Sequence, residues 1–230
     1  MKVGVILLCR FSSSRLPGKI MREINHRPVI DYITERILTV TDREQFCIAT
    51  STDLSDDIIY KYCQENDLKC YRGSLTNVAG RFLEAAVENQ WDYAVRINGD
   101  NFFVETNVLR LFLEKAQTGE YDFLSNTHNK TFPQGMSVEA VRTEFYQKAY
   151  LQFSEPEDFE HVTFFLHVNN IGKYFFYDNT TCPEATGLKF AIDEEKDFLL
   201  CKKLLSKMGD NYLGYNMKEI LNLYKQIDHE

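Results

Sequence analysis

Three features of the sequence predict an α/β fold built around a mostly parallel sheet. Short apolar runs without charge, such as Val3–Leu8, alternate with longer amphipathic segments through the first half of the chain. Strands buried on both faces by helices have this near-continuous apolar character. Polar segments follow the apolar runs, and in open α/β sheets ligands bind beyond the carboxyl ends of the strands. The chain has 230 residues, which is enough to bury one large core.

The expected elements of the first half alternate between strand and helix. We expect strands at 3–8, 45–51, 69–73, 92–99 and 121–126, and helices at 28–38, 55–66, 77–89 and 105–119. Pro28 lies in the first turn of its helix, Ser55 is the expected N-cap of the next, and Gly119 ends the last. This order places residues 9–19, 50–53, 72–73 and 98–101 along one edge of the sheet.

The alternation changes after Phe132. Residues 136–141 have the pattern of a half-exposed strand, 155–169 suit a helix, and 172–178 suit a strand. Residues 188–193 return to the pattern of a buried strand, and 194–208 and 217–228 are amphipathic helices. We expect one domain over 1–230, in which 132–180 forms a substrate flap or a dimerisation insertion.

Composition argues against two kinds of partner. The net charge is −8, from 34 acidic and 26 basic residues, which argues against a nucleic acid held by general phosphate attraction. The apolar run at the start is too short for a membrane span, and no signal-peptide cleavage pattern follows it. Six cysteines are present without a C-x-x-C pair or zinc spacing. We therefore expect reduced thiols, a cytoplasmic location and no membrane partner.

The segment CRFSSSRLPGKIM, residues 9–21, has the composition of an anion-binding loop. It is not a P-loop, because Ser13 stands where the first glycine is needed and Ile20 where a serine or threonine is needed. Arg10, Arg15 and Lys19 supply positive charge, and Ser12–Ser14 supply hydroxyls and backbone amides. Composition alone leaves open the alternative of a basic surface turn.

The same segment resembles the R-x-x-S-x-R-L-P-G-K signature of the cytidylyltransferases that make CMP-activated sugars. These include the CMP-sialate and CMP-Kdo synthetases, and the likeness is greatest to relatives of the spore coat polysaccharide biosynthesis protein F type. Further blocks follow in the family's order: CIATSTDLSDD, CYRGSLTNVAGRF, VRINGDNFFVE, FPQGMSVEAV, EHVT and LKFAIDEEKDFLL. The resemblance therefore spans nearly the whole chain.

The resemblance implies a Rossmann-like three-layer sandwich of the nucleotide-diphospho-sugar transferase type. It also implies transfer of CMP from CTP to a sugar, expected to be acidic and nonulosonic- or Kdo-like, with release of pyrophosphate for surface polysaccharide biosynthesis. Positioning and charge neutralisation carry such a reaction. Arg10, Arg15 and Lys19 match the triphosphate-contacting positions, and Leu8, Ser12, Ser14 and Gly18 complete the expected nucleotide-binding loop. A homodimer formed through 132–180 is a further expectation from the resemblance.

Two aspartates are candidates for holding Mg²⁺, which prefers oxygen ligands. Asp100 and Asp193 each follow an expected strand and match metal-binding aspartates of the family. The alternatives are a turn residue for Asp100 and a helix N-cap for Asp193. CMP-sialate synthetases often carry a second aspartate where this chain has Ala191, so the resemblance leaves open whether one or two metal ions bind.

Base and sugar recognition are expected from the polar edge of the sheet and from the later blocks. We expect Arg72, Asn98 and backbone groups near Leu8 to read cytosine, with Gly99 allowing close approach of the backbone. Arg96 either reads the base or anchors its strand by pairing with a carboxylate. Residues expected near the sugar are Gln134, Glu139 and His161; a metal pair of His161 with His167 is the less favoured alternative.

Two other functions compete with this interpretation. A glycosyltransferase of the same fold would be expected to carry an Asp-x-Asp metal site, and none occurs in the chain. A non-catalytic nucleotide-binding homologue is suggested by four residues that stand where acids are common in the family: Asn77, Gly80, Ser137 and Ala191. The presence of Lys19, Asp100 and Asp193 argues against this second alternative.

Overall fold

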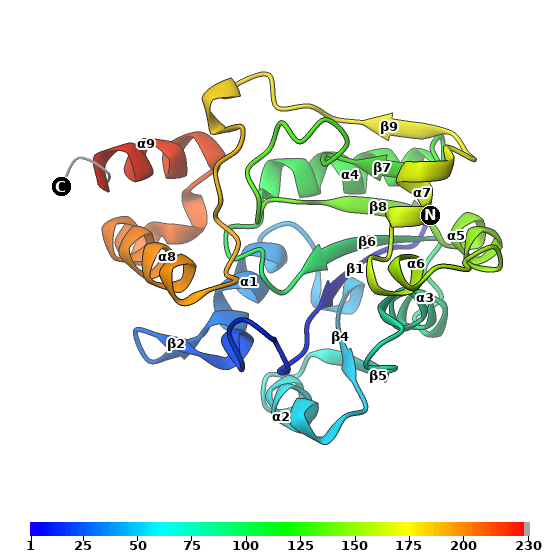
Figure 1. Ribbon diagram of the computed structural model, residues 1–230, viewed down its shortest axis with the longest axis horizontal. Coiled ribbons are helices and arrows are strands. Elements are labelled where there is room, and N and C mark those ends of the chain that lie inside the picture. Colours follow the sequence, from blue (N-terminus) through cyan, green and yellow to red (C-terminus); the bar gives the residue numbers. More distant parts are fainter. Residues whose placement is uncertain (228–230) are drawn as a thin grey trace.

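A seven-stranded sheet runs through the centre of the computed structural model, which describes residues 1–227 (Figure 1). The strand order is β5 (Lys69–Gly73), β4 (Phe46–Ser51), β1 (Val3–Leu8), β6 (Tyr93–Asn98), β8 (Glu139–Arg142), β7 (Phe123–Ser125) and β9 (Tyr174–Phe176). All neighbouring strands pair in parallel except β8, which is antiparallel to both β6 and β7. The predicted α/β fold with a mostly parallel sheet is confirmed.

Helices cover both faces of this sheet and form two cores. Successive residues of β1 alternate between them, with Val5 and Leu7 in one core and Ile6 and Leu8 in the other. The first core is completed by α1 (Val29–Leu38), α2 (Asp57–Glu65), α4 (Thr106–Thr118), α8 (Glu195–Met208) and α9 (Met217–Ile227). The second core is completed by α3 (Val78–Glu88), α5 (Thr143–Tyr150) and α7 (Phe164–Asn169), with α6 (Pro156–Glu160) packed against α3. The result is a three-layer sandwich, as expected.

Short elements complete the described chain. A small hairpin joins β2 (Glu23–Ile24) to β3 (Arg27–Pro28). Short 3₁₀ segments occupy Lys19–Met21, Arg43–Gln45, Leu54–Asp56, Pro183–Ala185 and Gly209–Gly214. Among residues 1–227, no helix has both the length and the apolar character needed to cross a lipid bilayer.

The predicted elements of the first half are confirmed to within a few residues at their ends. One cap differs: α2 begins at Asp57, and the preceding 3₁₀ turn is capped by Asp53, whose carboxylate accepts hydrogen bonds from the backbone N–H and the hydroxyl of Ser55. Gly119 ends α4 in the left-handed conformation, as predicted.

Three predictions for the second half are wrong. Residues 188–193 form no strand, because their backbone bonds are divided between two loops: Phe190 N–H donates to Gln134, and Ile192 N–H donates to Asp100. The strand expected at 136–141 begins only at Glu139 and is buried rather than half-exposed. The helix expected at 155–169 is two short helices, α6 and α7. Asp228, the last residue of the expected final helix, lies outside the described residues.

The segment 132–180 is continuous with the rest of the fold. It supplies β8 and β9 to the central sheet, and α5, α6 and α7 on one of its faces. Figure 1 shows α5 and α6 beside α3, on the side of the molecule opposite α8 and α9. This segment therefore forms one wall beside the carboxyl ends of the central strands.

Candidate active site

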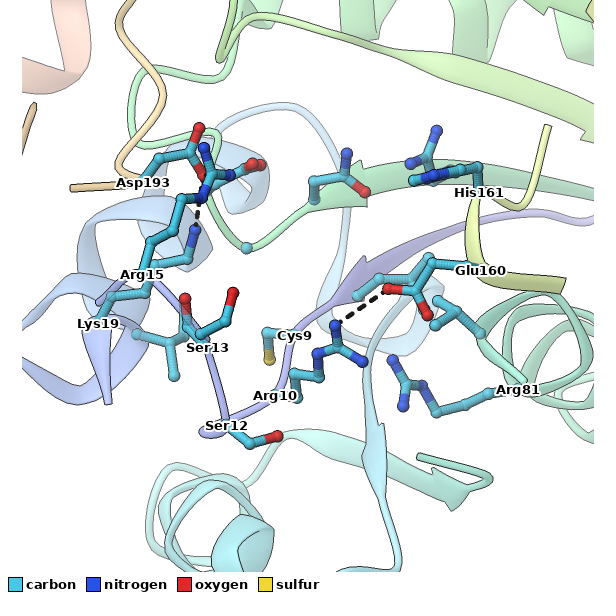
Figure 2. Close-up of a pocket in the computed structure, with 18 residues that line it drawn as sticks. Cys9, Arg10, Ser12, Ser13, Arg15, Lys19, Arg81, Glu160, His161 and Asp193 are labelled. Carbon is cyan, nitrogen blue, oxygen red and sulfur yellow. Dashed lines mark hydrogen bonds and ion pairs between the residues drawn. The ribbon is translucent and has the colours of Figure 1, made fainter. Parts of the chain in front are cut away.

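A cavity of about 320 Å³ opens at the carboxyl ends of β1 and β6 (Figure 2). Its walls come from the loop after β1, the end of β6, helix α3, the end of α6 and the segment before α8. The lining residues are Leu8, Cys9, Arg10, Ser12, Ser13, Ser14, Arg15, Lys19, Ile20, Val78, Arg81, Arg96, Asn98, Gly99, Asp100, Glu160, His161 and Asp193. The position agrees with the edge of the sheet expected from the sequence.

The loop after β1 folds back on itself through Gly18. Its φ of 69° lies in the left-handed region, and a Cβ there would come within 2.9 Å of the Phe11 ring. The Gly18 N–H donates to the Phe11 carbonyl at 2.9 Å, which closes the loop. This turn brings Arg10 and Lys19, from opposite ends of the loop, to the same cavity. Gly18 shapes the loop without lining the cavity.

Three cations surround Asp193 at one end of the cavity. Its Oδ1 lies 2.9 Å from Arg15 Nη2 and 3.2 Å from Lys19 Nζ, and its Oδ2 lies 3.2 Å from Lys189 Nζ. Lys19 also donates to the Ile192 carbonyl at 2.5 Å. Burial raises the pKa of Asp193, but the charges of Lys19 and Lys189 outweigh this effect and lower the pKa overall. Asp193 is therefore an ionised carboxylate, and Figure 2 shows Arg15 and Lys19 converging on it.

The structure rules out one alternative for Asp193. The N-cap of α8 is Glu194, which forms a capping box with Asp197. The side chain of Asp193 is left to face the cavity.

Asp100 lies at the end of β6 and is tied to the segment that carries Asp193. The Ile192 N–H donates to the Asp100 carbonyl at 3.0 Å. The Oδ1 atom of Asp100 is buried and has no hydrogen-bond partner within residues 1–227. Burial raises the pKa of Asp100; Lys19 opposes this, and the negative charge of Asp193 adds to it. A buried carboxylate oxygen without a donor, next to a second carboxylate, is suited to a cation.

Asp100 and Asp193 are better suited to Mg²⁺ than to a metal ion whose ligands all come from protein side chains. Within the described part of the chain, no group of three or more His, Cys, Asp or Glu side chains is arranged to hold a metal ion. Mg²⁺ is commonly held by one or two carboxylates together with substrate phosphates and waters. Asp100 and Asp193 match this donor set.

The other end of the cavity contains two residues that the sequence analysis did not single out. Arg81, on α3, is 2% exposed and donates to the Ser74 carbonyl at 2.9 Å, while its buried Nε has no partner among the described residues. Burial lowers the pKa of Arg81. Glu160, at the end of α6, pairs with Arg10 at 3.0 Å. Arg81 lies in the block CYRGSLTNVAGRF and Glu160 in the block EHVT, both of which carried the resemblance. The sequence of a block does not indicate which of its side chains face the cavity.

A bend between α6 and α7 turns His161 toward the cavity. Val162, at the bend, is fully buried with a φ of 40°, and its carbonyl accepts the Tyr146 hydroxyl at 2.5 Å. A β-branched residue in this region is strained, at a cost of about 1–3 kcal/mol, and persists where packing fixes it. The bend explains why one continuous helix was wrongly predicted over 155–169.

Glu139 lies behind the cavity and is not among its lining residues. It is 3% exposed and accepts hydrogen bonds from Arg96 Nη1, from the Thr163 hydroxyl at 2.6 Å, from the Ser125 hydroxyl at 3.0 Å and from His167 Nε2 at 2.7 Å. Burial raises the pKa of Glu139, but His167 and Arg96 together lower it to about 2. Glu139 thus ties β8 to β6, β7 and α7 instead of facing the cavity.

Arg96 has the anchoring role considered in the sequence analysis. It lies directly opposite Glu139 in the β6–β8 pairing and forms a buried ion pair with it, while also lining the cavity. His167 is bound to Glu139, whereas His161 lines the cavity. The two histidines therefore do not form a metal pair.

Two other expected site residues lie outside the cavity. Arg72 donates to the carbonyls of Ser51 at 2.8 Å and Asp53 at 3.1 Å and pairs with Asp57 at 2.8 Å. Gln134 is exposed, and its backbone pairs with residues 188–190. Leu8, Asn98 and Gly99 do line the cavity. A Cβ at Gly99 would lie 2.7 Å from Cys9 Cβ, so the close approach of β6 to β1 requires glycine here.

The fold and the cavity together define an α/β protein whose site suits a phosphorylated ligand: cations and serines on one loop face two carboxylates. A family model described as Cytidylyltransferase matches residues 4–204. The chain therefore belongs to the cytidylyltransferase family and is a nucleotidyltransferase. The alternative of a glycosyltransferase is not supported.

Known proteins similar to this chain are consistent with that assignment. The spore coat polysaccharide biosynthesis protein SpsF of Bacillus subtilis is 27% identical over 215 residues, covering 89% of this chain and 87% of that protein. A 3-deoxy-manno-octulosonate cytidylyltransferase of a Psychrobacter species is 30% identical over 113 residues, covering 47% of this chain and 40% of that enzyme. The solved structure of a cytidylyltransferase from Leptospira borgpetersenii superposes with a TM-score of 0.92 at 24% identity, covering 100% of this chain and 96% of that one.

Proposed function

We propose that this protein is a Mg²⁺-dependent CTP:sugar cytidylyltransferase. It would transfer CMP from CTP to a sugar, release pyrophosphate and act in surface polysaccharide biosynthesis. One observation carries the proposal: the cations Arg15 and Lys19 of the β1 loop converge on Asp193, beside the unpartnered carboxylate oxygen of Asp100. This is an arrangement suited to a triphosphate and a divalent cation.

In the proposed reaction, a sugar hydroxyl oxygen attacks the α-phosphorus of CTP. A new P–O bond forms between the sugar oxygen and the α-phosphorus, the bond to the pyrophosphate oxygen breaks, and the hydroxyl proton passes to solvent water. Arg10, Arg15 and Lys19 bind the triphosphate and neutralise the charge that develops on it. Without ligand, Arg15 and Lys19 are paired with Asp193, and Arg10 is paired with Glu160. We infer that phosphate oxygens take over these contacts when CTP binds.

Asp100 and Asp193 would hold the Mg²⁺ ion. When bound, Mg²⁺ supplies further charge neutralisation to the phosphates. Lys19 contacts Asp193 and opposes the rise that burial imposes on the pKa of Asp100, so its charge favours the ionised carboxylates that a metal ion requires.

The nucleoside would bind where β1, β6 and α3 meet. Cytosine presents the O2 and N3 acceptors and an amino donor. Asn98 and the buried guanidinium of Arg81 are the lining groups suited to these atoms, together with the backbone at Leu8. Arg72 has no part in this proposal, since all of its contacts are made away from the cavity.

The acceptor sugar would bind beside His161 and Arg96. A guanidinium fixed by Glu139 and open to the cavity suits an acidic sugar of the kind acted on by 3-deoxy-manno-octulosonate cytidylyltransferases. We retain the expectations of one domain over 1–230, of a homodimer formed through 132–180 and of a cytoplasmic location as parts of the proposal. Gln134 and Glu139 are left out of the sugar site.

Pyrophosphate release tests the proposed activity. The protein is incubated with each of the four nucleoside triphosphates, Mg²⁺ and a panel of acidic and neutral sugars, and the CMP-sugar is identified by mass spectrometry. We expect pyrophosphate and CMP-sugar with CTP and an acidic sugar only. Failure to bind any nucleoside triphosphate at millimolar concentration would overturn the proposal, and binding of CTP without transfer to any sugar would favour the non-catalytic alternative.

A further inference from the structure

The block CIATSTDLSDD contains a buried carboxylate for which the proposed reaction has no use. Asp56 follows β4 in the 3₁₀ turn Leu54–Asp56, is fully buried and does not line the cavity. It forms no ion pair with residues 1–227. Burying a carboxylate is costly unless hydrogen bonds stabilise its charge. Its hydrogen bonds therefore indicate what it stabilises.

Asp56 joins two backbone segments through its two oxygens. Oδ1 accepts the Phe11 N–H at 2.6 Å, and Oδ2 accepts the Ser51 N–H at 2.9 Å and the Ser51 hydroxyl. Each oxygen therefore faces a different backbone N–H group. A carboxylate meets this demand, but an asparagine amide cannot, because its nitrogen would face one of the two N–H groups.

The first of these segments is the β1 loop at the point where the loop is closed. Phe11 donates its N–H to Asp56 and accepts the Gly18 N–H on its carbonyl. Its ring also packs against Gly18. Arg10, next to it in the chain, extends into the cavity. The backbone next to Arg10 is thus fixed by two hydrogen bonds of Phe11, one to the Asp56 carboxylate and one from the Gly18 N–H.

We propose that Asp56 is a positioning residue for the phosphate-binding loop: its carboxylate fixes Phe11 to the end of β4 and so places Arg10 for the triphosphate. This inference rests on the proposed function for its ligand, but the tether itself is a property of the loop. It also accounts for an aspartate in the block after β4 that touches neither the cavity nor a described cation.

Asp56→Asn tests the inference against a control at the same carboxylate. Ser51→Ala removes the hydroxyl donor to Oδ2 but leaves both backbone N–H groups bonded to Asp56. We expect D56N to weaken binding of CTP and of tripolyphosphate about tenfold or more, the scale of one lost charge-assisted hydrogen bond. Binding of cytidine should be unchanged, and S51A should bind all three probes within about twofold of the wild type.

Equal weakening of cytidine and tripolyphosphate in D56N would show a general structural defect and overturn the inference, as would unchanged tripolyphosphate binding. Amide hydrogen exchange of Phe11, followed by NMR, gives a second measurement that does not depend on the variant folding. We expect slow exchange in the wild type and faster exchange in D56N than in S51A. Fast exchange of this amide in the wild type would overturn the tether. A wild-type protein that binds no nucleoside triphosphate would refute the proposed function, while hydrogen exchange would still decide the role of Asp56.

Discussion

Lys19→Ala should lower the rate of transfer about 10²–10³-fold while leaving the fold intact. In the structure, the side chain of Lys19 is 15% exposed, and its ammonium lies between the Ile192 carbonyl and Asp193, at the end of the cavity where we place the phosphates. Removing one group that stabilises charge in the transition state costs about 2.7–4 kcal/mol, or 10²–10³ in kcat. Arg15 and Lys189 still pair with Asp193 in the variant, so we expect stability to fall by only about 1 kcal/mol.

The assay measures initial rates of pyrophosphate release together with thermal unfolding. Lys196→Ala is a matched control, because Lys196 is 77% exposed, pairs only with Glu194 among the described residues and does not line the cavity. Lys19→Arg keeps the charge and should recover part of the rate. A K19A enzyme as active as K196A would refute the assignment of the loop.

Three further substitutions test the site. Asp100→Asn should abolish Mg²⁺-stimulated turnover yet raise Tm at neutral pH, because burial raises the pKa of Asp100 and its ionised form destabilises the fold. The gain in Tm of D100N over the wild type should vanish below about pH 4, where the carboxyl is also protonated in the unfolded chain. A lower Tm of D100N at neutral pH would contradict this prediction. Glu139→Gln should cost ~3 kcal/mol of unfolding free energy at neutral pH, since the pKa of Glu139 falls from 4.5 to about 2. The wild type loses this stability as pH falls from 4.5 to about 2, so urea denaturation should show the free-energy difference between wild type and E139Q shrinking over that pH range. An equal cost in the exposed Glu144→Gln would contradict this prediction. Arg81→Lys should weaken CTP binding about tenfold or more with little effect on tripolyphosphate binding, because Arg81 lies at the opposite end of the cavity from Lys19. Calorimetry that shows a larger loss of affinity for tripolyphosphate than for CTP would refute our placement of the base.

The first half of the fold could be predicted because its signals are local. The apolar runs of β1, β4 and β6 are short and bounded by polar segments, and the cations of residues 9–19 follow β1 directly. Since the carboxyl ends of parallel strands meet at one edge, the positions of Arg10, Lys19 and Asp100 followed from strand order alone.

The errors occur where distant segments decide the structure. Residues 188–193 have the apolar pattern of a strand, but their backbone partners are Gln134 and Asp100 in two separate loops. Glu139 became a buried partner of Arg96 because β8 pairs antiparallel with β6 in one particular register, which no local pattern specifies. Arg72 carries the charge expected of a ligand-binding residue. Its guanidinium is instead held outside the cavity by the carbonyls of Ser51 and Asp53 and by the carboxylate of Asp57.

The structure of the protein with CTP and Mg²⁺ bound tests the central claim most directly. We predict a triphosphate contacted by Arg10, Arg15 and Lys19, a metal ion held by Asp100 and Asp193, and cytosine at the end of the cavity beside Asn98 and Arg81. A nucleotide bound outside this cavity, or with its base against Lys19 and its phosphates against Arg81, would contradict the account.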